Sequence, residues 1–149
     1  MRQSMCCKAV MVLVLAGLVC MTGGCASMEG SWKKAQQRNS SQSYSRFIRE
    51  YPDSPYVGQA QKQIEGLAYQ KAVTRNRMTA YQEFIKKYPA GPYTAQAREK
   101  LAELEKAAED RAFEKARKKD TPYAYEQFLK SYPQSVRKEQ AQKRIREKK

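Results

Sequence analysis

One pattern of aromatic, apolar and proline positions occurs three times along the chain. Its copies are Tyr44-x-x-Phe47-Ile48-x-x-Tyr51-Pro52, Tyr81-x-x-Phe84-Ile85-x-x-Tyr88-Pro89 and Tyr125-x-x-Phe128-Leu129-x-x-Tyr132-Pro133. The hydrophobic positions fall at i, i+3, i+4 and i+7, which places them on one face of a short helix, and we expect Phe47, Phe84 and Phe128 to lie in the core. Because proline disfavours a helical residue before it, each helix is predicted to end at its Tyr-Pro.

The match between the copies extends to both sides of this motif. In each copy an aromatic residue and an alanine precede the motif, and an alanine and a branched apolar residue follow it. The preceding pairs are Trp32/Ala35, Tyr69/Ala72 and Phe113/Ala116, and the following pairs are Ala60/Ile64, Ala97/Leu101 and Ala141/Ile145. The copies are 37 and 44 residues apart. The difference of seven residues is about two helical turns, so a helix can lengthen without rotating its apolar face. We interpret the chain as three repeats of one helical unit.

This pattern predicts an all-α fold of seven helices and no strand. The predicted helices are Ser31 to Arg38, Ser43 to Tyr51, Pro55 to Arg75, Thr79 to Tyr88, Pro92 to Lys119, Pro122 to Tyr132 and Val136 to Lys148. The prolines that open three of them suit the first helical position, where a missing N–H costs nothing. Ser41 and Ser43 are predicted to cap the second helix, and Ser135 the last one.

The first 24 residues have the pattern of a signal peptide. Arg2 and Lys8 give a positive start, Ala9 to Met21 is an apolar run, and Thr22-Gly23-Gly24 is small and flexible. We therefore expect residues 1–24 to be a signal peptide, residues 25–30 an acylated start and linker, and residues 31–149 the helical repeat domain.

Cys25, followed by Ala26 and Ser27, resembles the lipobox cysteine of bacterial lipoproteins, although Thr22 stands where that family usually has an aliphatic residue. The resemblance implies cleavage before Cys25 and attachment of a diacylglycerol and an N-acyl chain such as palmitate, which together hold a small domain stably on a membrane. Alanine after the cysteine implies the outer membrane, with the domain facing the periplasm. Two alternatives remain open, an uncleaved membrane anchor and ordinary signal cleavage after Ala26.

The repeats resemble the tetratricopeptide superfamily, in the divergent form of periplasmic and outer-membrane lipoproteins that includes a lipoprotein of the barrel-assembly machinery. Thr79 to Leu104 follows the pattern Ala-Tyr-x-x-Phe-Leu-x-x-Tyr-Pro-x-Ser/Gly-x-Tyr-x-x-x-Ala of that family, and the resemblance covers Trp32 to Ile145. It implies a short superhelical stack of about three tetratricopeptide-like hairpins after the signal peptide. Repeat domains of this kind usually bind another protein.

The amino-acid composition limits the reactions that the protein could catalyse and the metal ions that it could bind. The sequence contains no histidine, which excludes a Ser-His-Asp or Cys-His nucleophile pair and any His metal ligand. Three of its four cysteines fall within the leader. We expect no catalytic residue, no cofactor and no metal ion, and therefore no enzyme.

The charge is strongly positive, +14 at pH 7. Without the leader's two cations, 27 basic residues remain against 15 acidic ones. Export and the scatter of these cations argue against a nucleic-acid partner. Arg117-Lys118-Lys119 and the segment from Arg137 to Lys149 are denser than the rest, and charge of this kind can attract anionic lipid headgroups.

We expect an envelope lipoprotein that acts as a non-catalytic adaptor for another envelope protein. The alternative is a soluble periplasmic protein that binds an anionic lipid or envelope polymer through its basic C-terminal segment. Candidate contact residues are Tyr56, Tyr93, Arg117, Lys118, Lys119, Arg137, Lys138, Lys143, Arg144 and Arg146, with Cys25 as the lipidation site.

Overall fold

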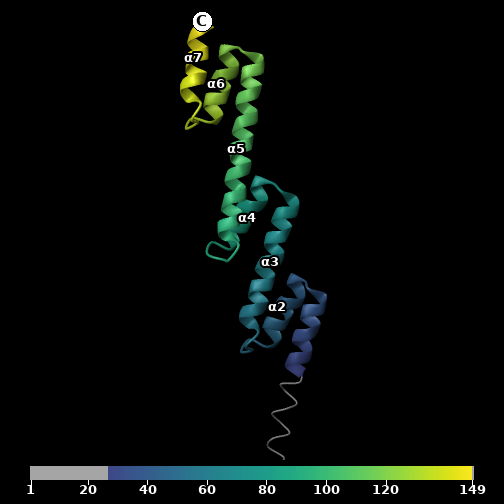
Figure 1. The fold of residues 1–149 in the computed structure, drawn as a ribbon. Helices are drawn as coiled ribbons and strands as arrows, with labels where there is room; N and C mark the ends of the chain where they lie inside the picture. Colours follow the sequence, from purple (N-terminus) through teal and green to yellow (C-terminus); the bar gives the residue numbers. More distant parts are fainter. Residues whose placement is uncertain (1–26, 149) are drawn as a thin grey trace, which may run out of the picture. The chain divides into compact units, whose positions relative to one another are not determined.

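The computed structural model describes residues 27–148, and the regular structure in this range is α-helical throughout (Figure 1). A helix over residues 27–38 is followed by α2 (Ser41–Glu50), α3 (Val57–Arg75), α4 (Met78–Lys87), α5 (Thr94–Lys119), α6 (Pro122–Ser131) and α7 (Lys138–Glu147). The predicted all-α class and each of the predicted helices are confirmed. The chain forms two compact units, and the boundary between them falls within α3, between Gln70 and Lys71.

The ends of the helices confirm the role of the Tyr-Pro pairs. Tyr51, Tyr88 and Tyr132 are the C-caps of α2, α4 and α6. Each tyrosine N–H donates to the carbonyl of the phenylalanine four residues earlier, at 2.9 Å. The proline that follows cannot continue the helix.

Several helix starts differ from the prediction. Residues 27–30 of the predicted linker are helical. Pro55 and Pro92 do not open helices, because α3 and α5 begin two residues later, at Val57 and Thr94. The chain first makes a turn, in which Ser54 N donates to Tyr51 O and Val57 N donates to Ser54 O, both at 3.1 Å.

Serine and threonine caps also differ in part from the prediction. Ser40, not Ser41, is the N-cap of α2, and Ser43 completes a reciprocal capping box with it from inside the helix. Ser135 lies before the N-cap of α7, which is Arg137, and accepts a hydrogen bond from the Arg137 N–H. Pro122 opens α6 as predicted, with Thr121 as its N-cap.

The first unit is built around Trp32. Its indole lies 5.7 Å from the ring of Tyr44 and 5.2 Å from that of Phe47, measured between centroids, so the first helix and α2 share one aromatic cluster. Ala60 of α3 completes this core with no exposed surface. The predicted core position of Phe47 is confirmed.

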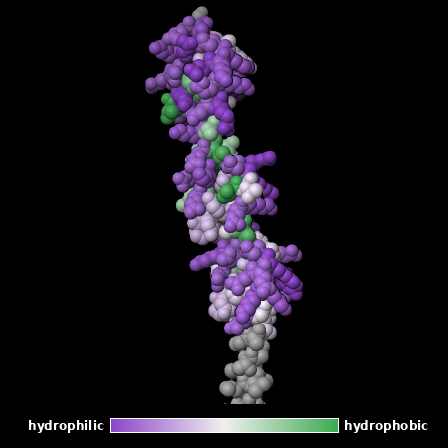
Figure 2. All heavy atoms as spheres, turned by 45° about the vertical axis from the view of Figure 1, so that its right-hand side comes forward, coloured by the Kyte–Doolittle hydropathy of each residue, from purple (hydrophilic) through white to green (hydrophobic). Residues whose placement is uncertain are grey.

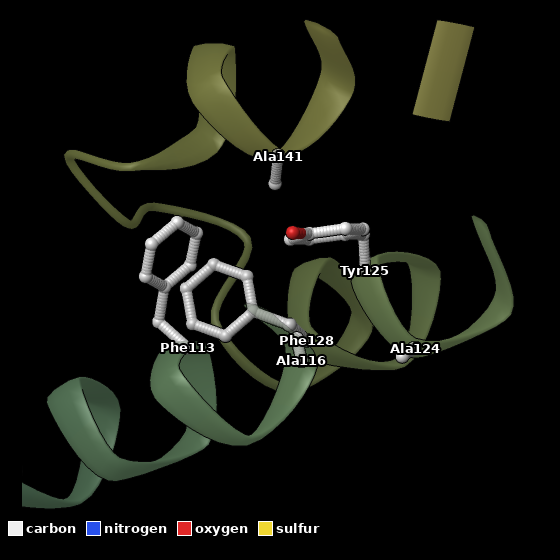
Figure 3. Close-up of a cluster of buried hydrophobic side chains, with 6 residues drawn as sticks. All are labelled: Phe113, Ala116, Ala124, Tyr125, Phe128 and Ala141. Atoms are coloured by element: carbon white, nitrogen blue, oxygen red, sulfur yellow. The ribbon is translucent and has the colours of Figure 1, made fainter. Parts of the chain in front are cut away.

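The second unit repeats this arrangement. Residues that correspond to the first core are again buried, namely Ala72, Tyr81, Phe84 and Ala97, and then Phe113, Ala116, Tyr125, Phe128 and Ala141. Figure 3 shows the last group, in which the rings of Phe113 and Phe128 lie side by side, 5.2 Å apart, and the Ala141 methyl points at the ring of Tyr125. The predicted core positions of Phe84 and Phe128 are therefore also confirmed.

The long helix α5 accommodates the longer repeat spacing. It has 26 residues against 19 in α3, a difference of seven that equals the difference between the two spacings. Within the second unit, α4 lies along the first half of α5 and α6 along its second half, and α7 packs on α6 (Figure 1). One continuous helix thus closes one repeat and opens the next.

The turn after the first helix of each repeat has the same backbone geometry. Asn39, Asn76 and Asp120 hold corresponding positions and have φ of 40, 43 and 45°. Asn and Asp tolerate this left-handed conformation better than most residues. The side chain also binds the core, since Tyr44 Oη donates to Asn39 Oδ1 and Tyr125 Oη to Asp120 Oδ1, both at 3.2 Å.

In the third repeat this residue is charged and holds the last helix. Asp120 accepts hydrogen bonds from Arg144 at 2.7 and 2.8 Å and forms an ion pair with Lys148 at 2.6 Å. Hydrogen bonds from Lys148, and then from Arg144, lower the pKa of Asp120 from 3.8 to about 2. Leucines occupy the positions of Lys148 in the earlier repeats, so the terminal helix exchanges an apolar contact for a charged one.

This network predicts a stability that depends on pH. Because the pKa of Asp120 is lowered in the folded state, its ion pairs stabilise the protein fully above pH 3.8 and are lost as the pH falls toward about 2. Asp120→Asn keeps the residue type that the other repeats have at this turn. We expect the variant to melt below the native protein at pH 7, and the two melting temperatures to converge near pH 2. A constant difference between pH 7 and pH 2 in thermal melts followed by circular dichroism would contradict this role.

The aromatic core of the first unit predicts a second effect. Phe47→Ala removes a buried ring from the cluster around Trp32, and such truncations cost about 3–5 kcal/mol of unfolding free energy. Trp32 is the only tryptophan, so urea unfolding followed by its fluorescence reports on this cluster. The exposed residue Gln61 of α3 provides the control Gln61→Ala, for which we expect a change within about 0.5 kcal/mol. Equal midpoints for the two variants would show that the cluster does not stabilise the unit.

Candidate functional site

Tyr56 and Arg137 occupy corresponding positions, and both pack over the aromatic residue in the first helix of their repeat. Tyr56 is half-buried and stacks on Trp32, with ring planes 2° apart and centroids 5.2 Å apart. The Arg137 guanidinium lies 5.2 Å from the ring centre of Phe113 and forms an ion pair with Asp110. Packing thus accounts for both side chains. The third residue in this column, Tyr93, is half-buried at the N-cap of α5.

The basic C-terminal segment is a packed helix. Ala141 of α7 is fully buried and Ile145 packs on the same cluster. Of the six basic residues from Arg137 to Lys148, four form ion pairs with acidic side chains, namely Arg137, Lys143, Arg144 and Lys148. Among the described residues, Lys138 and Arg146 have no ion-pair partner. Three carboxylates, those of Asp110, Asp120 and Glu147, thus pair with four of the six cations and partly neutralise the charge that suggested a surface for anions.

The other predicted contact residues lie elsewhere. Arg117, Lys118 and Lys119 form the last turn of α5, where cations interact favourably with the helix dipole. Arg117 is paired with Glu114 at 2.8 Å. Cys25, the predicted lipidation site, lies outside the described residues.

A groove lies between the two helices that open each repeat, at the same place in all three repeats. In the first repeat it has a volume of about 200 Å³ between the first helix and α2, and is lined by Lys34, Arg38, Arg46 and Glu50, with the buried Ala35 and Phe47 behind them. In the third it has a volume of about 300 Å³ between α5 and α6, and is lined by Lys115, Lys119, Tyr123 and Gln127, with Ala116 and Phe128. We call these the repeat grooves.

The second repeat groove has a volume of about 490 Å³ and lies between the end of α3 and α4. Its lining includes Arg75, Arg77, Ala80 and Glu83. Arg75, Ala80 and Glu83 hold the sequence positions of Arg38, Ser43 and Arg46 in the first groove. The grooves are therefore a property of the repeat and not of one local irregularity.

Two positions on the first helix of each repeat are basic in every copy. They are Lys34, Lys71 and Lys115 at one position, and Arg38, Arg75 and Lys119 four residues later. Residues four apart lie on one helix face, with Cβ atoms about 5–6 Å apart. All six side chains are exposed, and none has an ion-pair partner within residues 27–148. We call them the groove cations; five of them line a groove, and Lys71 lies one turn before Arg75, outside the lining of the second groove.

Sequence analysis missed the groove cations because it compared only the apolar positions of the repeats. The signal was present in the same alignment, since the spacings of 37 and 44 residues also bring these cations into register. Scattered lysine and arginine are expected on any helix surface. Arg49, Lys86 and Lys130 are also basic in every copy, so it is position in a groove, which five of the six groove cations have, that distinguishes them from other recurrent cations.

Each repeat groove has an excess of positive side chains. The first has three cations and Glu50, whose carboxylate is paired with Arg46 at 2.7 Å. The second has two cations and Glu83, and the third has Lys115 and Lys119 with no acidic side chain in its lining. An anion that enters a groove meets cations that no carboxylate of the described chain neutralises.

The remaining surface carries little apolar area. The face in Figure 2 is hydrophilic apart from small, separate hydrophobic patches. The exposed large hydrophobic residues of the described chain include Val136 and Tyr123, and Tyr123 lies in the third groove with 69% of its surface exposed. In residues 27–148, no helix has the length and apolarity needed to span a bilayer, and no cluster of acidic and cysteine side chains could hold a metal ion.

Comparisons of the chain with protein-family models, with curated proteins and with solved structures found no match.

The stack of Tyr56 on Trp32 gives a third prediction. Tyr56→Ala removes a ring pair of a kind that contributes about 0.5–1.5 kcal/mol beyond the buried area. We expect a lower urea midpoint and a red shift of the Trp32 emission in the folded protein, because water gains access to the indole. Tyr56→Phe keeps the ring and serves as the control. Indistinguishable spectra for Tyr56→Ala and the native protein would contradict the packing role.

Proposed function

We propose that this chain is a lipoprotein of the bacterial outer membrane whose tetratricopeptide-like repeats form a non-catalytic scaffold for another envelope protein. The observation that carries the proposal is the recurrence of one groove in all three repeats. Helical repeats that present equivalent surfaces suit a partner that extends along them.

The lining of the grooves supports binding over catalysis. It consists mainly of lysine, arginine, hydroxyl and apolar side chains with Glu50 and Glu83, of which Glu50 is paired with Arg46, and the chain has no histidine to act as a general base. Groups of this kind hold charged or polar ligands without activating them. An adaptor only has to bind its partner, so side chains of this kind are sufficient for that function.

Acylation at Cys25 would place the first unit close to the membrane. Residue 27 is already part of the first helix, and two residues span at most about 7 Å. The scaffold would then hold its partner near the surface of the bilayer. The alternative function, in which a soluble protein binds anionic lipid through its C-terminal segment, has less support, because four cations of that segment are paired internally.

Lipidation gives a fourth prediction, on the mature mass. Intact-mass spectrometry of the membrane-extracted protein should give a chain that begins at Cys25 and carries acyl chains. Cys25→Ala should abolish the added mass, whereas the leader variant Cys20→Ala should leave it unchanged. An unmodified mature mass for the native protein would rule out the anchor.

The scaffold itself is tested by site-specific photo-crosslinking in cells. A photoreactive amino acid at Lys34 or Lys115 lies in a repeat groove, and one at the exposed Gln142 of α7 lies outside the grooves. We expect one discrete protein adduct from both groove positions and none from Gln142. Equal adducts at all three positions, or none at either groove position, would contradict the proposal.

A further inference from the structure

We infer that the repeat grooves bind an acidic, extended polypeptide segment of the partner, through carboxylates held between the groove cations. This inference rests on the proposed scaffold function and names the chemistry of its ligand. Its evidence is the recurrence of the cations, the position of five of the six in the grooves, with both cations present in the first and third grooves, and the character of the residues around them.

The recurrence of the groove cations has no explanation in packing. Apolar columns repeat because each core needs them, but all six cations are exposed and have no ion-pair partner in the described structure. Other groove positions change freely, since Arg46 corresponds to Glu83 and to Gln127. Among the columns that line the grooves, only the two cationic columns keep their charge in every copy. A third basic column, Arg49, Lys86 and Lys130, lies outside the grooves in the last turns of α2, α4 and α6, where the helix dipole favours cations.

The helix dipole explains one of the two columns at most. Arg38 and its equivalents lie in the last turn of their helices, where a cation gains about 0.3–1 kcal/mol. Lys34 and its equivalents lie a full turn earlier, and the effect falls off within the last turn. A ligand that needs both cations accounts for both columns.

The geometry of the cation pair suits alternate side chains of an extended chain. Cβ atoms four residues apart on a helix are about 5–6 Å apart. Side chains on one side of an extended segment repeat about every 6.6 Å. Glutamate or aspartate at every second position can therefore meet both cations of one groove, with charge-assisted hydrogen bonds.

The neighbouring residues favour spaced carboxylates over a dense phosphate polymer or a membrane. Glu50 and Glu83 lie in two of the grooves and would repel closely spaced phosphates. The cations stand in grooves backed by buried side chains such as Phe47, whereas a membrane surface calls for a convex face on which cations and large apolar residues occur together. In the third groove, the exposed ring of Tyr123 offers a surface for the apolar residues of a peptide.

The test measures binding of the full mature chain to fluorescent 12-residue peptides by anisotropy. One peptide alternates Glu with Ser, and its neutral counterpart alternates Gln with Ser. We expect the acidic peptide to bind and added salt to weaken it, while the neutral peptide binds at least about tenfold more weakly, since each charged contact is worth about one factor of ten. Equal binding of the two peptides would overturn the inference.

Matched variants separate the grooves from the overall charge. Lys34→Gln with Arg38→Gln, or Lys115→Gln with Lys119→Gln, should weaken binding of the acidic peptide by about tenfold. Arg49→Gln with Lys62→Gln removes the same charge from exposed positions outside the grooves and should change it less than about twofold. Similar losses in groove and control variants would overturn the inference.

A pair of charge-reversing substitutions distinguishes the loss of the groove cations from a loss of the fold. The double variant Lys34→Glu with Arg38→Glu should bind the acidic peptide more weakly than the native protein does. It should also bind a peptide that alternates Lys with Ser, and an unfolded chain would not show this selectivity. Phosphatidylglycerol vesicles that bind through the groove cations, without peptide binding, would overturn the inference in favour of a membrane. If the groove positions still crosslink to a partner while the Glu and Gln peptides bind equally, the proposed scaffold function is supported and only the acidic character of its ligand is contradicted.

Discussion

The fold depends on one contact, the seating of an alanine of a following helix against the tyrosine and phenylalanine rings of the helix before it. Ala60, Ala97 and Ala141 have no exposed surface, and each follows a motif that carries a buried tyrosine and a buried phenylalanine. Only a methyl group lets the helix approach the rings this closely (Figure 3). A short helical pair therefore needs a third helix to bury its rings, and within the second unit α5 serves two repeats in turn.

The same contact positions the repeat grooves. Because the aromatic rings fill the inner side of each repeat, the first two helices leave a groove between their outer faces, as the linings that include Phe47 and Phe128 indicate. A residue at the position of Arg38 then faces the groove in every copy, and a residue at the position of Lys34 does so in the first and third copies. A repeated core thus produces a repeated surface.

The sequence was sufficient to predict the seven helices and the core, because apolar periodicity determines which faces are buried. The starts of α3 and α5 were missed because the turns after Tyr51 and Tyr88 are closed by local hydrogen bonds that precede the helices. The partial neutralisation of the C-terminal segment was missed because its partners are distant, with Asp120 24 residues from Arg144 and Asp110 27 residues from Arg137. Polar contacts of this range leave no periodic signal, and for the same reason the grooves emerged only when the helices were placed beside each other.

The central claim is that three equivalent grooves on one chain bind one ligand, and amide chemical shifts test it most directly. Isotope-labelled protein would be titrated with the alternating Glu-Ser peptide, and the backbone amide spectrum recorded at each step. The account predicts concerted shifts around residues 34–38, 71–75 and 115–119, with α7 unaffected. Shifts confined to α7, or an unchanged spectrum at saturating peptide, would contradict it.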